Sequence, residues 1–230
     1  MNKNIHGLLF DKDGTLFDFE SSWGPWYADL LQDLAGDETL AAQLAAAVHF
    51  NLSTGRFGGE SILIHGTADD FLDIVLPLLP HWNRDHLSEH VLQQSEHVAQ
   101  IPVLPLAPLF DGLITTGLKL GIATNDNEIP AIVQLKTAGI HDSFAFIAGC
   151  DSGFGAKPGN GMQNEFCAAT GLNPATVAMV GDSAHDLVSG RNAGMQTIAV
   201  LTGIATHAEL APLADVVLRD IGEIPGWLAG

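Results

Sequence analysis

The sequence predicts an α/β protein with a parallel-sheet core and an inserted all-helical cap domain. Short apolar runs alternate with helical patterns over much of the chain, which is typical of a parallel sheet. Residues 18–101 interrupt this alternation with helical patterns and no convincing strand. Polar residues follow several of the apolar runs directly. Because ligands bind at the carboxyl ends of strands in an open α/β sheet, these polar residues predict a binding site at that edge.

Six short apolar runs are expected to form the strands of the core. They cover residues 7–10, 118–123, 144–148, 177–180, 197–200 and 216–218. Helical patterns between them cover residues 129–138, 162–170 and 185–193. This alternation predicts a Rossmann-like, discontinuous core made of residues 1–17 and 102–230.

The cap is expected between the first two of these strands. Four helix-like stretches lie near residues 23–34, 38–48, 68–79 and 84–100. A proline-rich segment at 102–108 then returns the chain to alternation. An all-helical cap over residues 18–101 is the simplest account.

The composition is that of a folded and strongly acidic protein. Of the 230 residues, 47% are hydrophobic and 16% are charged, and the net charge is −18. This charge argues against nucleic acid or an anionic membrane as a partner, because both attract basic surface. The most apolar stretch, residues 101–124, contains three prolines and two charged residues, so it is unsuited to span a membrane.

The cysteines and the N-terminus bear on location. Cys150 and Cys167 have neither disulfide-framework nor metal-type spacing and are expected to be buried free thiols. The first ten residues hold too short an apolar run for a secretion signal. Both features predict a cytoplasmic location.

Two carboxylates open the first motif, DKDGTL at residues 11–16. Asp11 and Asp13 can face one ligand if the loop turns, and Gly14 permits a tight turn. One carboxylate can attack phosphorus to form an aspartyl-phosphate, while the other protonates the leaving oxygen and then activates water. A polar turn is the alternative. A calcium-binding EF-hand is excluded, because Leu16 and Ser22 stand where that loop needs Gly and Glu.

Three further motifs follow later strands. Thr124 and Asn125 offer a hydroxyl and backbone N–H groups to a phosphoryl oxygen, although a threonine there is as often a helix cap. Lys157, in a glycine-rich run, can offset negative charge at the site or be a solvated loop residue. Asp182 and Asp186 share one face of a helical turn and suit Mg²⁺, with helix capping as the alternative.

In this order the four motifs resemble those of the haloacid dehalogenase (HAD) superfamily of phosphohydrolases, and most of all its phosphoglycolate phosphatase group. The matching motifs are Asp-x-Asp-Gly-Thr-Leu, Thr-Asn, Lys-Pro and Gly-Asp-Ser-x-x-Asp. The helical insertion looks like the family's C1 cap. The resemblance implies that Asp11 is the nucleophile and a Mg²⁺ ligand. It also implies that Asp13 is the general acid and base, with its backbone carbonyl on the metal.

The same resemblance implies roles for the later motifs. Thr124 and Asn125 would hold the phosphoryl group and Lys157 would neutralise its charge. Asp182 would ligate Mg²⁺, and Asp186 would orient the metal site, acting through water. 

Two positions depart from the family pattern. Lys12 stands where relatives more often have an apolar residue, so it is expected either to point away from the site or to meet the substrate. After Lys157 and Pro158 the chain reads Gly-Asn-Gly where relatives often have another proline, which leaves the start of the next helix open.

The expected activity is that of a phosphoric monoester hydrolase acting on a small phosphorylated metabolite, phosphoglycolate-like or sugar-phosphate-like. Asp13 separates the chain from the dehalogenases, which have no leaving alcohol to protonate. A phosphomutase of the beta-phosphoglucomutase type keeps all four motifs and remains an alternative. A non-catalytic phosphate-binding descendant is a second alternative.

Substrate choice is expected to lie in the cap. Arg56, in a polar and flexible turn, is expected to face the active site and contact an anionic group of the substrate, with a surface arginine as the alternative. The cap histidines show no metal-ligand spacing. Trp23 and Trp26 are expected to pack at the cap entrance rather than to form a platform for the substrate.

Overall fold

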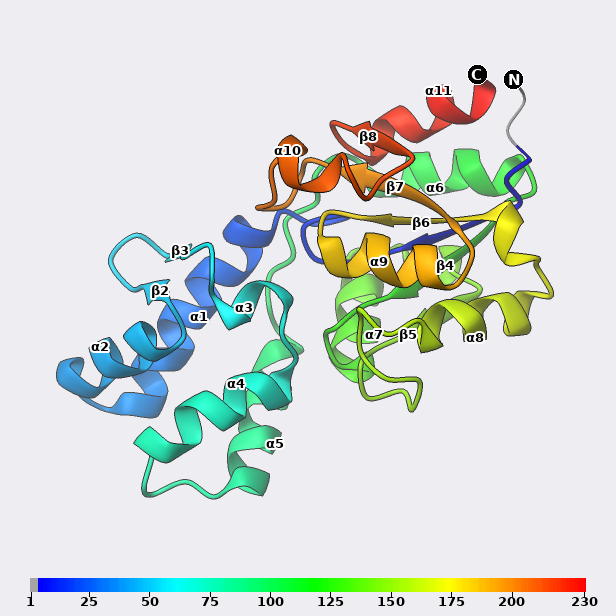
Figure 1. Ribbon diagram of the computed structural model, residues 1–230. Helices are drawn as coiled ribbons and strands as arrows, with labels where there is room; N and C mark the ends of the chain where they lie inside the picture. The colour runs from blue at the N-terminus through cyan, green and yellow to red at the C-terminus, as the bar shows by residue number, and fades with distance from the viewer. Residues whose placement is uncertain (1–3) are drawn as a thin grey trace.

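The core is a six-stranded sheet in which every pair of neighbours is parallel. The structure is a computed structural model that describes residues 4–230. The strands are β1 (Gly7–Phe10), β4 (Lys119–Ala123), β5 (Phe146–Ala148), β6 (Val177–Gly181), β7 (Gln196–Val200) and β8 (Val216–Leu218). Their order is β5-β4-β1-β6-β7-β8, so β1 lies inside the sheet between β4 and β6 (Figure 1). The residue that follows β1 therefore lies near the middle of the carboxyl edge.

Helices cover both faces of the sheet, as the alternating side chains of β1 require. Leu8 and Phe10 point to one face, where the Phe10 ring meets the ring of Phe110 at 5.6 Å between ring centroids. Leu9 points to the other face and packs in a cluster with Phe166. The helices of the core are α6 (Leu106–Thr115), α7 (Glu128–Thr137), α8 (Gly161–Thr170), α9 (Ala184–Asn192), α10 (His207–Leu210) and α11 (Ile224–Ala229). Short 3-10 turns are η2 (His141–Ser143), η3 (Pro174–Thr176) and η4 (Ile221–Glu223).

Helix α6 begins inside the proline-rich segment, where the sequence predicted no helix. Pro105 is its N-cap residue and Pro108 lies in its first turn. The first N–H groups of a helix have no partner within it, so a proline there removes no hydrogen bond. The prolines therefore mark the start of a helix rather than a loop.

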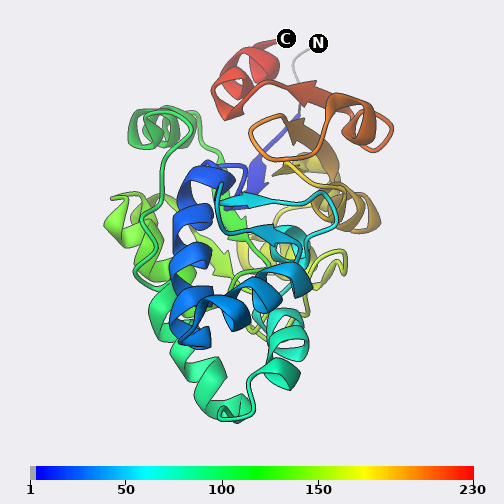
Figure 2. The ribbon, with the colours of Figure 1, turned by 90° about the vertical axis from the view of Figure 1, so that its left-hand side faces the viewer.

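A helical insertion lies between β1 and β4, as predicted. It contains α1 (Phe19–Ala35), α2 (Glu38–Ala47), α3 (Ile62–His65), α4 (Ala68–Val75), the 3-10 turn η1 (Leu76–Leu78) and α5 (Arg84–Ser95). The insertion forms a second lobe beside the sheet, in front of it in Figure 2. Its buried side chains form a hydrophobic cluster of their own, with members from residue 19 to residue 98.

The insertion is not all-helical, which corrects the prediction. Strands β2 (Phe50–Asn51) and β3 (Arg56–Phe57) pair as an antiparallel hairpin. Two-residue strands are too short to show an alternating pattern, so the sequence carried no strand signal here. The turn of the hairpin packs closely on α1, because a Cβ atom on Gly24 would lie 2.5 Å from the carbonyl oxygen of Gly55.

The two segments that join the lobes run side by side. The N–H of Asp18 donates to the carbonyl of Ile101 at 2.8 Å, and the N–H of Val103 donates to the carbonyl of Leu16 at 3.0 Å. These bonds flank the boundaries predicted after residue 17 and after residue 101. Residues 18–101 remain our proposed cap domain, with 1–17 and 102–230 as the proposed core.

Both cysteines are free thiols, Cys167 buried and Cys150 partly buried. Within residues 4–230, no helix combines the length and the apolar character needed to cross a membrane.

Candidate active site

The predicted site residues arrive at the carboxyl edge on neighbouring elements. Asp11 follows β1 directly, and its N–H donates to the carbonyl of Val180 in β6 at 2.8 Å. This bond extends the β1–β6 pairing by one residue and fixes the backbone of Asp11. Asp182 follows β6 directly, and Asp186 lies in the first turn of α9. Lys157 lies in the loop that precedes α8.

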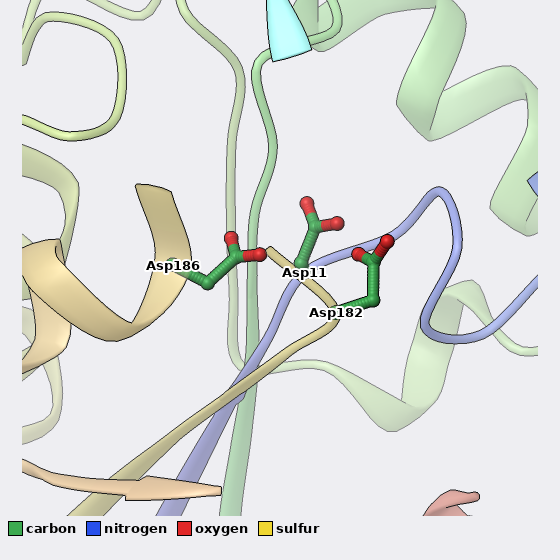
Figure 3. Close-up of side chains that lie close together, drawn as sticks. All are labelled: Asp11, Asp182 and Asp186. Atoms are coloured by element: carbon green, nitrogen blue, oxygen red, sulfur yellow. The ribbon is translucent and has the colours of Figure 1, made fainter. Parts of the chain in front are cut away.

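Asp11, Asp182 and Asp186 form a buried carboxylate cluster, with Asp11 between the other two (Figure 3). One oxygen of each lies within 4.8 Å of the others, and the three residues are 7%, 7% and 1% exposed. Burial raises the pKa of Asp11 to about 7, against the effect of Lys157. Burial, with the charges of Asp11 and Asp186, also raises the pKa of Asp182 well above its usual value. Three hard oxygen donors with unfavourable mutual charge fit a divalent cation such as Mg²⁺.

Lys157 places its ammonium group within this cluster. Its Nζ lies 2.5 Å from Oδ1 of Asp11 and 2.6 Å from Oδ1 of Asp186. Burial disfavours the charged form, but the two carboxylates outweigh it and raise the pKa of Lys157. Lys157 is therefore a buried, charged residue and not a solvated loop lysine.

Asp186 makes a capping contact as well as the contact with Lys157. The N-cap residue of α9 is Ser183 and not Asp182. Oδ2 of Asp186 accepts from the N–H of Ser183 at 3.1 Å and from its hydroxyl at 2.6 Å, which completes a capping box. The helix start thus holds Asp186 so that its other oxygen meets Lys157.

Thr124 and Asn125 lie in the loop after β4. Thr124 does not cap the next helix; its hydroxyl accepts from the N–H of Asp126 at 3.1 Å. The Asn125 side chain accepts from the N–H of Lys157 at 2.8 Å and donates to the carbonyl of Lys157 at 3.0 Å. It also donates to the carbonyl of His65 in the cap at 3.0 Å. Asn125 therefore fixes the backbone that presents Lys157 and links it to the insertion.

Asp13 is held from two sides. Its Oδ1 accepts from Nε1 of Trp23 in α1 at 2.7 Å, and Nζ of Lys12 lies 2.7 Å from its Oδ2. Lys12 is fully buried, with its Nζ 2.6 Å from Oε1 of Gln134 and 3.3 Å from Oδ2 of Asp126. Lys12 is not among the residues that line the cavity described next, but its ammonium contacts Asp13, so neither of its two predicted placements describes it.

A cavity of about 130 Å³ lies between the carboxyl edge and the insertion. The core contributes six of the predicted site residues to its lining: Asp11, Asp13, Thr124, Asn125, Lys157 and Asp182. Asp186 does not line the cavity but contacts Lys157 directly. Arg56 lies exposed on β3 and outside the lining, so its predicted contact with the substrate stays a prediction.

Aromatic residues of the cap line the opposite side of the cavity. Trp23, Trp26 and Tyr27 of α1 and Phe71 of α4 all face it. Trp23 and Trp26 pack on each other, with ring centroids 5.1 Å apart, and also line the cavity, which the sequence did not predict. Aromatic residues of an amphipathic helix pack in the same way whether or not a cavity lies beside them, so the sequence could not separate the two cases.

The loop after β7 supports the site and was missed. The Thr202 hydroxyl donates to the carbonyl of Gly14 at 2.7 Å, and a Cβ atom on Gly203 would lie 1.7 Å from Oδ2 of Asp182. In addition, the Thr15 hydroxyl donates to Oδ1 of Asp182 at 3.3 Å. The sequence could have indicated this loop as part of the site, because the loop directly follows the predicted strand 197–200 and so lies at the same edge of the sheet.

Comparisons with known proteins agree with this arrangement. A family model described as haloacid dehalogenase-like hydrolase matches residues 8–200. The chain is 36% identical over 211 residues to a phosphoglycolate phosphatase of Psychrobacter arcticus, covering 88% of this chain and 85% of that protein. It is 30% identical over 234 residues to a phosphoglycolate phosphatase of Chromobacterium violaceum, covering 96% of each.

The fold comparison extends over the full length. A solved structure of a predicted phosphoglycolate phosphatase from Haemophilus somnus matches with a TM-score of 0.71 at 17% identity, covering 98% of each chain. The family match spans most of the chain and includes all three residues of the carboxylate cluster. This chain belongs to the haloacid dehalogenase-like hydrolases.

Proposed function

We propose that the chain is a Mg²⁺-dependent phosphoric monoester hydrolase that acts through an aspartyl-phosphate on Asp11. The observation that carries this proposal is the convergence of Asp11, Asp182 and Lys157 on one cavity, with Asp13 on the same loop as Asp11. Hydrolysis of a phosphate ester by this route requires a nucleophile, an acid, a cation and metal ligands.

The donor set supports a role for Mg²⁺. We propose that the side chains of Asp11 and Asp182 and the backbone carbonyl of Asp13 hold the ion, with Asp186 orienting the site through water. The oxygens are hard donors, which Mg²⁺ prefers. When bound, Mg²⁺ neutralises charge that develops on the transferring phosphoryl group.

The protein groups carry out two displacements in this proposal. Asp11 attacks phosphorus while Asp13 gives a proton to the leaving oxygen as the ester bond breaks. Asp13 then takes a proton from water, which attacks the phosphorus of the aspartyl-phosphate and releases phosphate and Asp11. Lys157 favours the ionised form of Asp11 and offsets the charge of the phosphoryl oxygens. Thr124 and Asn125 hold those oxygens.

Two substrate types are candidates, a phosphoglycolate-like acid and a sugar phosphate. The relatives named phosphoglycolate phosphatase make 2-phosphoglycolate the first ester to test. A phosphomutase would use the same residues but would interconvert a sugar phosphate without net release of phosphate. Two unpaired cysteines suit a reducing compartment, so we propose the cytoplasm as the location.

Phosphate release from a panel of small esters tests the proposal. The panel contains p-nitrophenyl phosphate, 2-phosphoglycolate and glucose 6-phosphate, each with Mg²⁺ or with excess chelator. We expect Mg²⁺-dependent release that is lost in Asp11→Asn and retained in Asp111→Asn, a matched change at an exposed carboxylate of α6. Activity that survives in Asp11→Asn would refute the mechanism. Isomerisation of a sugar phosphate without phosphate release, followed by NMR, would favour the mutase.

A further inference from the structure

Four aromatic side chains in contact with one another lie on the cap side of the cavity. We call Trp23, Trp26, Tyr27 and Phe71 the aromatic wall. The rings of Trp23 and Trp26 lie 5.1 Å apart, those of Trp26 and Tyr27 lie 4.7 Å apart, and those of Tyr27 and Phe71 lie 5.9 Å apart. All four line the cavity, and apolar side chains such as Leu92 of α5 extend the surface. The part of a substrate that faces the cap therefore meets rings and methyl groups, together with the uncharged polar residues Thr67, Ser88 and Ser95.

The aromatic wall carries no charged partner for a substrate. Among the described residues, the cap contributes no Lys, Arg, Asp or Glu to the lining of the cavity. Arg56 is exposed on β3 and outside the lining. Arg84 is exposed too, and it pairs with Asp73 and, at 2.9 Å, with Asp69. The two arginines of the cap are thus both away from the cavity.

The core side of the cavity adds negative charge near the wall. Asp13 and Asp126 both line it, and the two carboxylates share one ammonium, that of Lys12, which does not line the cavity. Within residues 4–230, Lys157 is the only Lys or Arg of the lining, and its ammonium is shared between Asp11 and Asp186. A phosphoryl group at the site uses that ammonium, so no cationic side chain is left for a second anionic group on the same substrate.

The histidine that the cap contributes to the lining is not favoured as a cation. His65 of the cap and His185 of the core lie with their rings 5.3 Å apart, edge to face. Burial and the neighbouring imidazole lower the pKa of His65. Both effects disfavour the charged form of His65.

We propose that the preferred substrates are phosphate monoesters of uncharged, ring-bearing alcohols, and that esters with a carboxylate on the alcohol, such as 2-phosphoglycolate, are disfavoured. This inference rests on the proposed phosphatase function and narrows it. A carboxylate in this cavity would lose hydration and find no unpaired cation in the lining, because the buried Lys12 is already paired with Asp13 and Asp126. A ring would instead pack against the aromatic wall, as rings pack in protein cores.

Two pairs of esters that differ in one charge test the proposal on the wild-type protein with Mg²⁺. The pairs are benzyl phosphate with 4-carboxybenzyl phosphate, and 2-phosphoglycolamide with 2-phosphoglycolate. We expect kcat/KM to be about tenfold or more higher for the uncharged member of each pair, because like charges in a desolvated site repel strongly. Equal or higher values for the carboxylates would overturn the proposal.

The same assay separates this inference from the proposed function. Hydrolysis of all four esters without discrimination overturns the inference and leaves the phosphatase intact. Absence of Mg²⁺-dependent hydrolysis of these esters and of p-nitrophenyl phosphate overturns both.

A charge placed on the cap side tests the physical cause. Ser88 of α5 is exposed and lines the cavity, so a longer side chain there does not disturb the core. We expect Ser88→Arg to raise kcat/KM for 4-carboxybenzyl phosphate relative to benzyl phosphate. Ser88→Gln, which adds length without charge, should keep the wild-type preference. An unchanged preference in Ser88→Arg would contradict the assignment of charge as the cause.

Discussion

Lys12 is fully buried and lies between two carboxylates, those of Asp13 and Asp126. It also contacts Gln134, whose amide donates to the carbonyl of Ser95 in the cap at 2.8 Å. Burial raises the pKa of Asp126 to about 6 even though Lys12 opposes this shift. Without the ammonium, two carboxylates would lie in a poorly hydrated place with no compensating charge. At the scale of single residues, Lys12 therefore holds the predicted general acid in position and also stabilises the fold.

Replacing Lys12 should expose this dual role. We expect Lys12→Met to lower the free energy of unfolding by about 3–5 kcal/mol, the cost of breaking a buried ion pair from one side. Urea denaturation measures the change. Adding Asp126→Asn to Lys12→Met should recover part of the loss, because the amide needs no counter-charge. A cost within about 0.5 kcal/mol, as for a surface substitution, would contradict the assigned role.

The carboxylate cluster should make the metal-free protein sensitive to pH. Burial moves the pKa of Asp11 from 3.8 to about 7, so the folded state retains a proton that the unfolded state has released. Between these values the unfolded state binds fewer protons, and the contribution of Asp11 to stability falls as pH rises. The raised pKa of Asp182 acts in the same direction.

Asp182→Asn should therefore stabilise the metal-free protein. We expect a higher melting temperature than wild type in chelator at about pH 8, and a smaller difference at about pH 5, where the wild-type cluster holds more protons. Mg²⁺ should raise the melting temperature of wild type more than that of the variant. Circular dichroism follows both effects. A lower melting temperature for Asp182→Asn in chelator at about pH 8 would contradict the inference that the carboxylate cluster destabilises the metal-free protein.

At the scale of elements, the hairpin and α1 depend on a close contact. Gly24 is buried inside α1, and a Cβ atom there would lie 2.5 Å from the carbonyl oxygen of Gly55. Gly112, in the middle of α6, has nothing within 4 Å of the same position. The two glycines thus occupy helix interiors with opposite surroundings.

Alanine at these two positions should have opposite effects. Gly112→Ala should raise the free energy of unfolding by about 0.5–1 kcal/mol, the helix preference of alanine over glycine. Gly24→Ala should lower it, because the hairpin must move away from α1. Chemical denaturation of both variants gives the signs directly. Stabilisation by both substitutions would mean that the contact between α1 and the hairpin is not tight.

The elements that the sequence predicted best are the buried parallel strands. All six strands of the core were found within two residues of their bounds, because strands buried on both faces are continuous apolar runs. The hairpin could not be found, since its strands have two residues each and show no period. No helix was predicted at α6, because its first turn contains Pro108 and belongs to the proline-rich segment 102–108.

The site was predictable as far as it follows strand ends. Each of three site residues is the first residue after a strand: Asp11 follows β1, Thr124 follows β4 and Asp182 follows β6. The topology alone therefore brings them to one edge of the sheet. The position of Lys12 was not predictable, because its contact with Gln134 joins residues 122 positions apart. Such contacts depend on side-chain packing and leave no local pattern.

At the scale of the whole molecule, the net charge of −18 opposes the approach of an anionic substrate. The buried Lys157 and the proposed Mg²⁺ act only at short range, since salt screens charges beyond about 8 Å at physiological ionic strength. The long-range field of the protein should therefore repel phosphate esters before the local site attracts them.

This repulsion predicts an unusual salt response. We expect kcat/KM for p-nitrophenyl phosphate to rise as KCl is added at constant Mg²⁺, because screening weakens the repulsion. The turnover number kcat at saturating substrate should change little and serves as the control. A steady fall of kcat/KM with KCl would instead indicate attraction of the substrate by a positive surface.

The central claim is that Asp11 becomes phosphorylated, and Asp13→Asn with p-nitrophenyl phosphate tests it most directly. p-Nitrophenolate leaves without a proton, so this variant can still form the aspartyl-phosphate but lacks the base that activates water. We predict a burst of p-nitrophenol equal to the enzyme concentration and, after acid quench, a phosphoryl group on Asp11 by mass spectrometry. The double variant with Asp11→Asn should show neither. Steady release of p-nitrophenol with Asp11 unmodified would contradict the account.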